Sequence, residues 1–284
     1  MIPSEKINKS TIKSEMRHIN WQDLAPKVCQ LAKDAGEAIL SIYESEGSVD
    51  PLLAHKSDDS PLTLADLASH HCILQGLSAI TPDIPVVSEE DADSQTIRQS
   101  ASRFWLIDPL DGTKEFLARN GEFTVNIALI EAGTPVWGVV YAPVLKRLYW
   151  GGREHGALKA ADGQVSSLQV STAVDLNRPS RVVASKSHLN PETTAFIERL
   201  GIAELVQAGS SLKFCLIAEG SADVYPRLAP TCEWDTAAAQ AVVEGAGGYV
   251  YDTKGARLVY GKADVLNPSF IAASVPLNEL PGSR

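Results

Sequence analysis

The chain has 284 residues, of which 44% are hydrophobic and 21% are charged, and its 25 basic and 35 acidic residues give a net charge of -10. This composition is typical of a globular protein with a large buried core, and no apolar run reaches the length of a membrane span. The negative charge repels nucleic acid polymers and anionic lipid, so we do not expect a broad nucleic-acid-binding surface.

The cysteines and the N-terminal segment both indicate a reducing compartment. The four cysteines are far apart in sequence and form no C-x-x-C pair, which predicts reduced thiols: Cys29, Cys72, Cys215 and Cys232. The first twenty residues have neither the apolar stretch nor the small-residue cleavage site of a signal peptide. We therefore expect a cytoplasmic protein that begins with a flexible extension over residues 1–20.

The first half of the chain predicts two helices followed by strands. Apolar residues recur every three or four positions from Trp21, which predicts a long helix that ends near Gly47. A second helix is expected from Thr63 to just before Pro82. Short strands are expected at 85–87 and 104–107, the latter stopping before Asp108. An antiparallel pair is expected at 123–130 and 136–141 with a turn at 131–134, and the sheet continues at 149–150.

The second half alternates short strands with helices, which predicts a separate α/β unit. We expect strands at 182–185, 205–207, 223–225 and 249–251, and helices at 191–200, 211–218 and 235–244. The polar stretch before Pro179 marks the boundary. The sequence thus predicts two subdomains, 21–178 for metal binding and 179–274 for substrate binding, and a tail at 275–284.

The most specific segment is WLIDPLDGTKEF, which carries Asp108 and Asp111 three residues apart. If Pro109 makes a rigid turn, the two carboxylates face the same point, where a cation would relieve their repulsion. Mg²⁺ binds through one or two carboxylates and keeps positions open for phosphate oxygens. The backbone N–H groups of Gly112 and Thr113 would then face that phosphate.

Each acidic candidate also has a purely structural interpretation. The D-G-T triplet is common in hairpin turns, and Glu89 belongs to a run of acids that are usually solvated. Asp235 would cap a helix, and Asp66, three residues after Thr63, fits a capping box. Spacing alone leaves these alternatives open.

Three segments together resemble a known family. VVSEED with Glu89, DPLDGT from Asp108 to Thr113, and WDTAA with Asp235 resemble, in order and spacing, the signatures of the lithium-sensitive, Mg²⁺-dependent phosphatases of the inositol monophosphatase superfamily. Longer segments are similar to those of its bacterial 3'(2'),5'-bisphosphate nucleotidases: SPLTLADLASH, NGEFTVNIALI, GVVYAPV and GSSLKFCLIAEG.

The resemblance implies a layered α/β/α/β/α sugar-phosphatase fold with the active site between its two subdomains. It implies hydrolysis of the 3'-phosphate of adenosine 3',5'-bisphosphate to AMP in sulfur metabolism, with 3'-phosphoadenylyl sulfate as a second substrate. It also implies two or three Mg²⁺ ions and lithium sensitivity. The implied metal ligands are Glu89, Asp108, the backbone carbonyl of Leu110, Asp111 and Asp235.

The implied mechanism is in-line attack by a metal-activated water. Glu89 and Thr113, with Asp66 nearby, would orient that water. A bisphosphate also needs a second anion site, for which Lys213, Arg227 and His188 are the cationic or polar candidates, although such lysines and arginines are usually just solvated. The residues expected to contact substrate are Glu89, Leu110, Asp111, Gly112, Thr113, His188, Gly209, Ser210, Lys213, Arg227 and Asp235.

Two rival functions remain open at this point. An inositol or sugar monophosphatase would carry the same metal core, and a non-catalytic nucleotide or metal sensor would keep the fold without turnover. The expected partner is a small nucleotide bisphosphate rather than a nucleic acid polymer. Some relatives associate with the inner membrane, but no hydrophobic or polybasic anchor supports more than peripheral contact here. No sequence pattern sets an oligomeric state.

Overall fold

The structure is a computed structural model that describes residues 19–45, 52–55, 61–171, 179–184, 190–201 and 203–280, with the backbone alone for 52–55, 61 and 203. Gly47, the expected end of the first helix, and His188 lie outside the described residues. No helix of the described residues is both long and apolar enough to cross a membrane.

A seven-stranded sheet forms the centre of the N-terminal half. Its strands follow the order of the chain: β3 (Val86–Ser88), β4 (Arg103–Asp111), β5 (Thr124–Glu131), β6 (Thr134–Ala142), β7 (Arg147–Gly152), β8 (Gly156–Ala161) and β9 (Gln164–Ser167). All neighbours are antiparallel except β3 and β4. The expected antiparallel pair is confirmed as β5 and β6, which are joined at Glu131 and Thr134.

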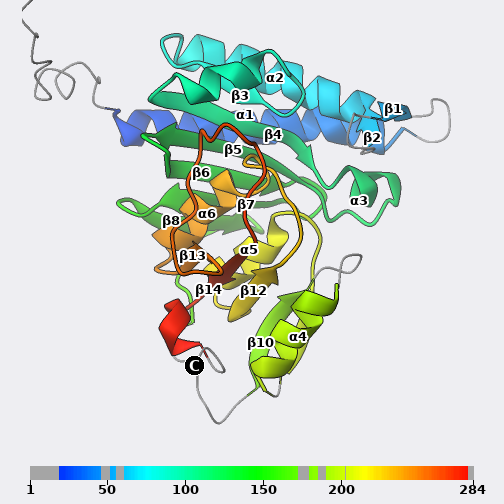
Figure 1. The fold of residues 1–284 in the computed structure, drawn as a ribbon. Helices are drawn as coiled ribbons and strands as arrows, with labels where there is room; N and C mark the ends of the chain where they lie inside the picture. The colour runs from blue at the N-terminus through cyan, green and yellow to red at the C-terminus, as the bar shows by residue number, and fades with distance from the viewer. Residues whose placement is uncertain are drawn as a thin grey trace, which may run out of the picture.

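Two helices cover one face of this sheet, α1 (Trp21–Tyr43) and α2 (Leu64–Ile80) (Figure 1). On β4, Trp105 and Ile107 pack toward these helices, whereas Phe104 and Leu106 pack on the opposite side. Successive side chains of a strand point to opposite faces, so a strand buried on both faces must be apolar at every position. The small hairpin of β1 (Leu52–His55) and β2 (Pro61–Thr63) leads into α2.

A second helical layer lies on the other face of the sheet and is formed by α5 (Leu212–Ala218) and α6 (Ala237–Gly245). It is followed by a five-stranded sheet in the order β11 (Ala203–Gln207), β10 (Ser180–Ala184), β12 (Val224–Arg227), β14 (Phe270–Ala273) and β13 (Tyr249–Asp252). The outer face of this sheet packs on α4 (Pro191–Arg199). The α/β/α/β/α layering is confirmed (Figure 1).

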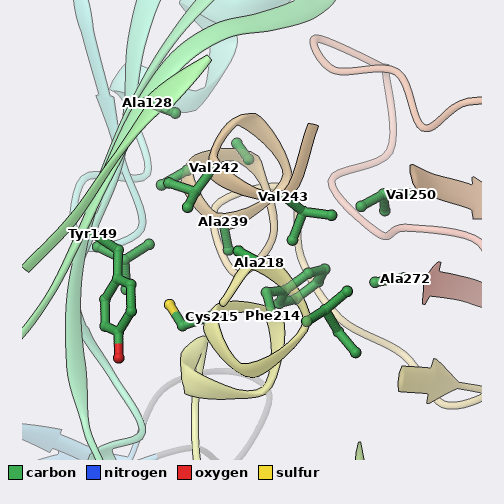
Figure 2. Close-up of a cluster of buried hydrophobic side chains, with 14 of the residues drawn as sticks. Ala128, Tyr149, Phe214, Cys215, Ala218, Ala239, Val242, Val243, Val250 and Ala272 are labelled. Carbon is green, nitrogen blue, oxygen red and sulfur yellow. The ribbon is translucent and has the colours of Figure 1, made fainter. Parts of the chain in front are cut away.

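One hydrophobic cluster runs through three of these layers. Figure 2 shows Ala128 and Tyr149 of the seven-stranded sheet, side chains of α5 and α6, and Val250 and Ala272 of the five-stranded sheet in the same core. The expected boundary at residues 178 and 179 falls between β9 and β10, where the chain passes from one sheet to the other. Subdomains 21–178 and 179–274 remain a prediction, and their cores are continuous.

The structure corrects several expected ends. The strand predicted to stop at Asp108 continues to Asp111, so Pro109 lies within β4 and makes no turn. The helix expected from Asp235 begins at Ala237. Within the predicted tail, the 3-10 turn η3 (Leu277–Glu279) brings Leu280 onto the outer face of the five-stranded sheet, where it is 5% exposed.

Candidate active site

The two aspartates of β4 reach the same side of the sheet through a β-bulge. Asp108 is paired with Asn126 of β5 and Asp111 with Thr124, so two residues of β4, Pro109 and Leu110, lie opposite the single Val125 of β5. Residues three apart on a regular strand point to opposite faces. The extra residue of a bulge shifts the alternation by one position, so Asp108 and Asp111 point to the same face. Leu110 packs toward α1 and α2, while Asp111 turns toward α5. The bulge, rather than a turn at Pro109, accounts for the D-x-x-D spacing.

Gly112 and Thr113 follow the bulge and start the short helix α3 (Thr113–Leu117). Gly112 adopts φ +94°, a left-handed conformation that glycine takes without strain. The chain therefore passes from a strand into a helical turn, and the hairpin interpretation of D-G-T is wrong. Asp108, which is 1% exposed, accepts the N–H of Leu110 at 3.1 Å.

Asp66 and Thr113 form a hydrogen-bonded pair between α2 and α3. Asp66 is fully buried, and its Oδ2 accepts the backbone N–H and the hydroxyl of Thr63 at 2.8 and 2.6 Å. The capping box is therefore present, as one interpretation of the sequence predicted. The Thr113 hydroxyl lies 3.3 Å from Asp66 Oδ1 and 3.4 Å from the carbonyl oxygen of Leu110, so the capping residue also contacts the site.

Glu89 follows β3 directly and is held by its backbone. Its N–H donates to the carbonyl of Ile107 at 3.2 Å, which places it beside Asp108 at the same end of the two parallel strands. The preceding Ser88 is bonded to His70 Nδ1 of α2 at 2.9 Å. Glu89 is thus fixed at a strand end and does not belong to a freely solvated acidic run.

Asp235 lies in the turn that precedes α6. Its Oδ2 accepts the N–H of Cys232 at 2.7 Å, and the N-cap of the helix is Thr236, so the capping interpretation of Asp235 is wrong. Burial raises the pKa of Asp235 well above its ordinary value, and the negative charges of Asp111 and Glu89 add to the effect. These three carboxylates, from three distant segments, are therefore close enough to repel one another.

The chemistry of these donors suits a hard divalent cation. Carboxylate and carbonyl oxygens are the ligands that Mg²⁺ prefers, and a cation would remove the repulsion that raises the pKa of Asp235. The structure contains no group of three or more Asp, Glu, His or Cys side chains close enough to hold a metal ion, within the part of the chain that it describes. The acids share one region of the structure without forming a closed cage.

A pocket of about 130 Å³ opens beside these acids. Asp111, Gly112, Ser210 and Asp235 line it together with Glu115, Lys213, Phe214, Tyr225, Arg227, Thr231, Thr236 and Phe270. Lys213 is only 8% exposed, so the interpretation as a solvated surface lysine is wrong. Burial lowers the pKa of Lys213, and the nearby Arg227 lowers it further, whereas Asp111 opposes the shift.

Arg227 presents an unused donor near this pocket. Its Nε is buried and has no hydrogen-bond partner among the described residues, although the other end of the guanidinium donates to the carbonyl of Pro230 at 3.2 Å. Because the protein shields this Nε from solvent, a ligand in the pocket would meet the charge of the guanidinium rather than this N–H. Lys213 and Arg227 therefore provide two cationic groups next to the acidic cluster.

The loop before α5 lies against Glu122 and Asp111. The N–H of Gly209 donates to Glu122 Oε2 at 2.9 Å, and contact of Gly209 with substrate stays a prediction. Ser210 donates its hydroxyl to Asp111 Oδ2 at 2.6 Å. Asp111 is also held by three residues that were not among the predicted site residues, namely Thr124, Asn126 and Ser211.

The model of the inositol monophosphatase family matches residues 20–280 of the chain. The 3'(2'),5'-bisphosphate nucleotidase CysQ of Salmonella typhimurium is 52% identical over 245 residues, which are 86% of this chain and 97% of that protein. CysQ of Buchnera aphidicola is 40% identical over 258 residues, covering 90% of this chain and 95% of that protein.

Solved structures give the same result. CysQ from Bacteroides thetaiotaomicron, described as a bacterial member of the inositol monophosphatase family, superposes with a TM-score of 0.78 at 43% identity and covers 91% of this chain and 100% of its own. An IMPase of Thermotoga maritima superposes with a TM-score of 0.72 at 24% identity and covers 89% of this chain and 92% of its own, and this match supports the fold alone.

Proposed function

The chain belongs to the inositol monophosphatase family, and on this premise we propose that it is a 3'(2'),5'-bisphosphate nucleotidase that hydrolyses the 3'-phosphate of adenosine 3',5'-bisphosphate to AMP. One observation carries the proposal: the acids Glu89, Asp111 and Asp235, which repel one another, lie beside a pocket lined by the buried Lys213. An acidic cluster alone suits any phosphatase of the family, whereas an adjacent cationic pocket suits a substrate with a second phosphate.

The residues that would hold Mg²⁺ are Glu89, Asp108, the carbonyl of Leu110, Asp111 and Asp235. Two or three bound ions would supply Lewis-acid catalysis, by lowering the pKa of a bound water and neutralising charge on the leaving oxygen. The acids would be poor phosphate ligands without such cations, because like charges repel. Magnesium dependence, the number of ions and lithium sensitivity rest on the family resemblance.

Asp66 and Thr113 would orient the attacking water. The Thr113 hydroxyl donates toward Asp66 Oδ1 at 3.3 Å, which leaves a lone pair of the Thr113 oxygen to accept a hydrogen bond from a water. Glu89 would accept the second hydrogen bond of that water and take its one transferred proton as the water attacks. Asp66 is fully buried and bonded twice to Thr63, so this pair has a fixed geometry.

Lys213 and Arg227 would bind the second phosphate of the substrate. Both side chains line the pocket, so their charges would pair with phosphate oxygens there. The N–H groups of Gly112 and Thr113 are proposed contacts of the scissile phosphate. The proposed contact of His188, the use of 3'-phosphoadenylyl sulfate, the cytoplasmic location and any contact with the inner membrane stay predictions.

The proposal is tested by phosphate release from four substrates, with Mg²⁺ and with EDTA. Adenosine 3',5'-bisphosphate should be hydrolysed faster than 3'-phosphoadenylyl sulfate, inositol 1-phosphate or fructose 1,6-bisphosphate, and EDTA should abolish release. Faster turnover of inositol 1-phosphate would support the monophosphatase alternative. Nucleotide binding without release would support the sensor alternative.

The role of Lys213 is tested by comparing adenosine 3',5'-bisphosphate with adenosine 3'-phosphate. Lys213→Met keeps the length of the side chain and removes its charge, so kcat/KM should fall at least tenfold for the bisphosphate and much less for the monophosphate. Lys159→Met is the control, because Lys159 pairs with Glu219 and does not line the pocket. An equal loss for both substrates would contradict the assignment.

A further inference from the structure

Every described hydrogen bond to the carboxylate of Asp111 ends on the same oxygen. Oδ2 accepts the Ser210 hydroxyl at 2.6 Å and the N–H and hydroxyl of Ser211, both at 2.8 Å. The Asn126 amide and the Thr124 hydroxyl lie farther from it, at 3.3 and 3.4 Å. Three close donors already use the lone pairs of Oδ2, so a ligand in the pocket must bind through Oδ1.

Ser211 is the central residue of this arrangement. Its hydroxyl accepts the Asn126 amide at 2.9 Å, so its single proton must go to an acceptor, and Asp111 Oδ2 is closer than the carbonyl of Asp235 at 3.1 Å. Ser211 and Asn126 are each 1% exposed. Polar groups buried to this extent have few alternative partners, which makes the direction of each bond fixed.

The donors come from both halves of the molecule. Thr124 and Asn126 belong to β5 of the seven-stranded sheet, whereas Ser210 and Ser211 precede α5. Ser210 has φ +50°, a left-handed conformation that is costly for a residue other than glycine. Such strain is kept where the surrounding structure needs it, and here it directs the Ser210 hydroxyl at Asp111.

We infer that Ser211 is a positioning residue that, backed by Asn126, fixes the Asp111 carboxylate so that Oδ1 is presented to a divalent cation. The inference rests on the proposed role of Asp111 as a metal ligand. Ser211 acts through Asp111 and needs no contact with substrate. Residues behind the ligands of a metal typically change its affinity by about 10- to 100-fold when they are replaced.

The test is a calorimetric titration of the metal-free protein with Mg²⁺ alone. Ser211→Ala and the nearly isosteric Ser211→Cys both remove the strong donor, and each should raise the Mg²⁺ dissociation constant about tenfold or more. Ser211→Thr keeps the hydroxyl and should stay within threefold of the original protein. The cysteine variant leaves no cavity, so it keeps the test available if the alanine variant does not fold.

Asn190→Ala is the matched control for loss of stability. Asn190 caps α4 in the outer helix layer, accepting the N–H of Thr193 at 2.9 Å, and its loss should lower the melting temperature without changing Mg²⁺ affinity. A dissociation constant within twofold of the original in both Ser211→Ala and Ser211→Cys would overturn the inference. Absence of Mg²⁺ binding by the unaltered protein would instead refute the metal assignment itself.

Discussion

Gly138 of β6 sets how closely α6 approaches the seven-stranded sheet. A Cβ atom at this position would lie 2.4 Å from the carbonyl oxygen of Ala238, 2.7 Å from its Cα and 2.9 Å from its carbonyl carbon. All three are backbone atoms of α6, so no side-chain rotation relieves the clash. Ordinary contact begins near 3.4 Å, and Gly138→Ala therefore requires α6 to move by about 3.4 minus 2.4, or 1 Å.

The displacement should reduce both stability and activity. Overpacking of this kind costs about 1–3 kcal/mol, which for a chain of this size lowers the melting temperature by roughly 2–12 °C. Asp235 lies two residues before the start of α6, so it should move with the helix. A misplacement of about 1 Å can cost on the order of 100-fold in rate.

Thermal unfolding and phosphate release from adenosine 3',5'-bisphosphate measure the two effects. Gly163→Ala is the control: Gly163 has φ +73° in the turn between β8 and β9, and a Cβ atom there would have no neighbour within 4 Å. It should cost about 1–2 kcal/mol through backbone strain alone and leave activity intact. Unchanged stability and activity in Gly138→Ala would refute the argument that this contact places Asp235.

Burial lowers the pKa of His70, so the unfolded chain binds more protons than the native chain just below pH 6.5. The free energy of unfolding should therefore rise with pH up to about 6.5. Urea titrations at several pH values should show this slope, and His70→Gln should flatten it. Glu233 is fully buried and accepts the N–H groups of Gly261 and Lys262 at 2.9 and 3.0 Å and the Lys262 ammonium at 2.5 Å. Glu233→Gln should therefore lower the free energy of unfolding by roughly 2–3 kcal/mol. A decrease below about 0.5 kcal/mol in urea unfolding would contradict this. Mg²⁺ at about one hundred times its dissociation constant should add about 2.7 kcal/mol to the free energy of unfolding. The Asp235→Asn variant should lose most of this stabilisation. An undiminished stabilisation in the variant would exclude Asp235 as a ligand.

The order of the longer helices and strands could be predicted from hydrophobic periodicity, whereas the strands β1, β2, β8, β9 and β14, which have three to six residues, were not predicted. Alternation and the predicted turn at 131–134 place β5 and β6 within two residues of their observed ends. The layering came from family resemblance, since periodicity within one element contains no information on which face packs against which neighbour. The bulge in β4 was missed for a related reason: an acid after an apolar run predicts a strand end, and only pairing with β5 shows that the strand continues.

The acidic candidates could be selected because charged residues at element ends are conspicuous, and the family resemblance chose the metal-ligand set among them. Their neutral partners were not, since Thr124 and Asn126 lie within an otherwise apolar strand and Ser211 begins a helix, where serine is ordinary. One signal was available: Thr124 and Asn126 are two apart and thus share a face of β5. Polar residues on a buried face need partners, and that pattern predicts a polar site at this end of the strand.

The layer of α5 and α6 belongs to both sheets, and this constrains the order in which the protein can be completed during synthesis. When β9 has been made, the face of the seven-stranded sheet that carries Ala128 and Tyr149 is still uncovered, because the second of its covering helices ends at Gly245. Those 78 residues, 245 minus 167, take roughly 4–16 seconds at ordinary translation rates. We therefore expect the nascent chain to expose apolar surface during that interval, and synonymous codon changes between residues 168 and 245 should change its yield without altering the mature protein.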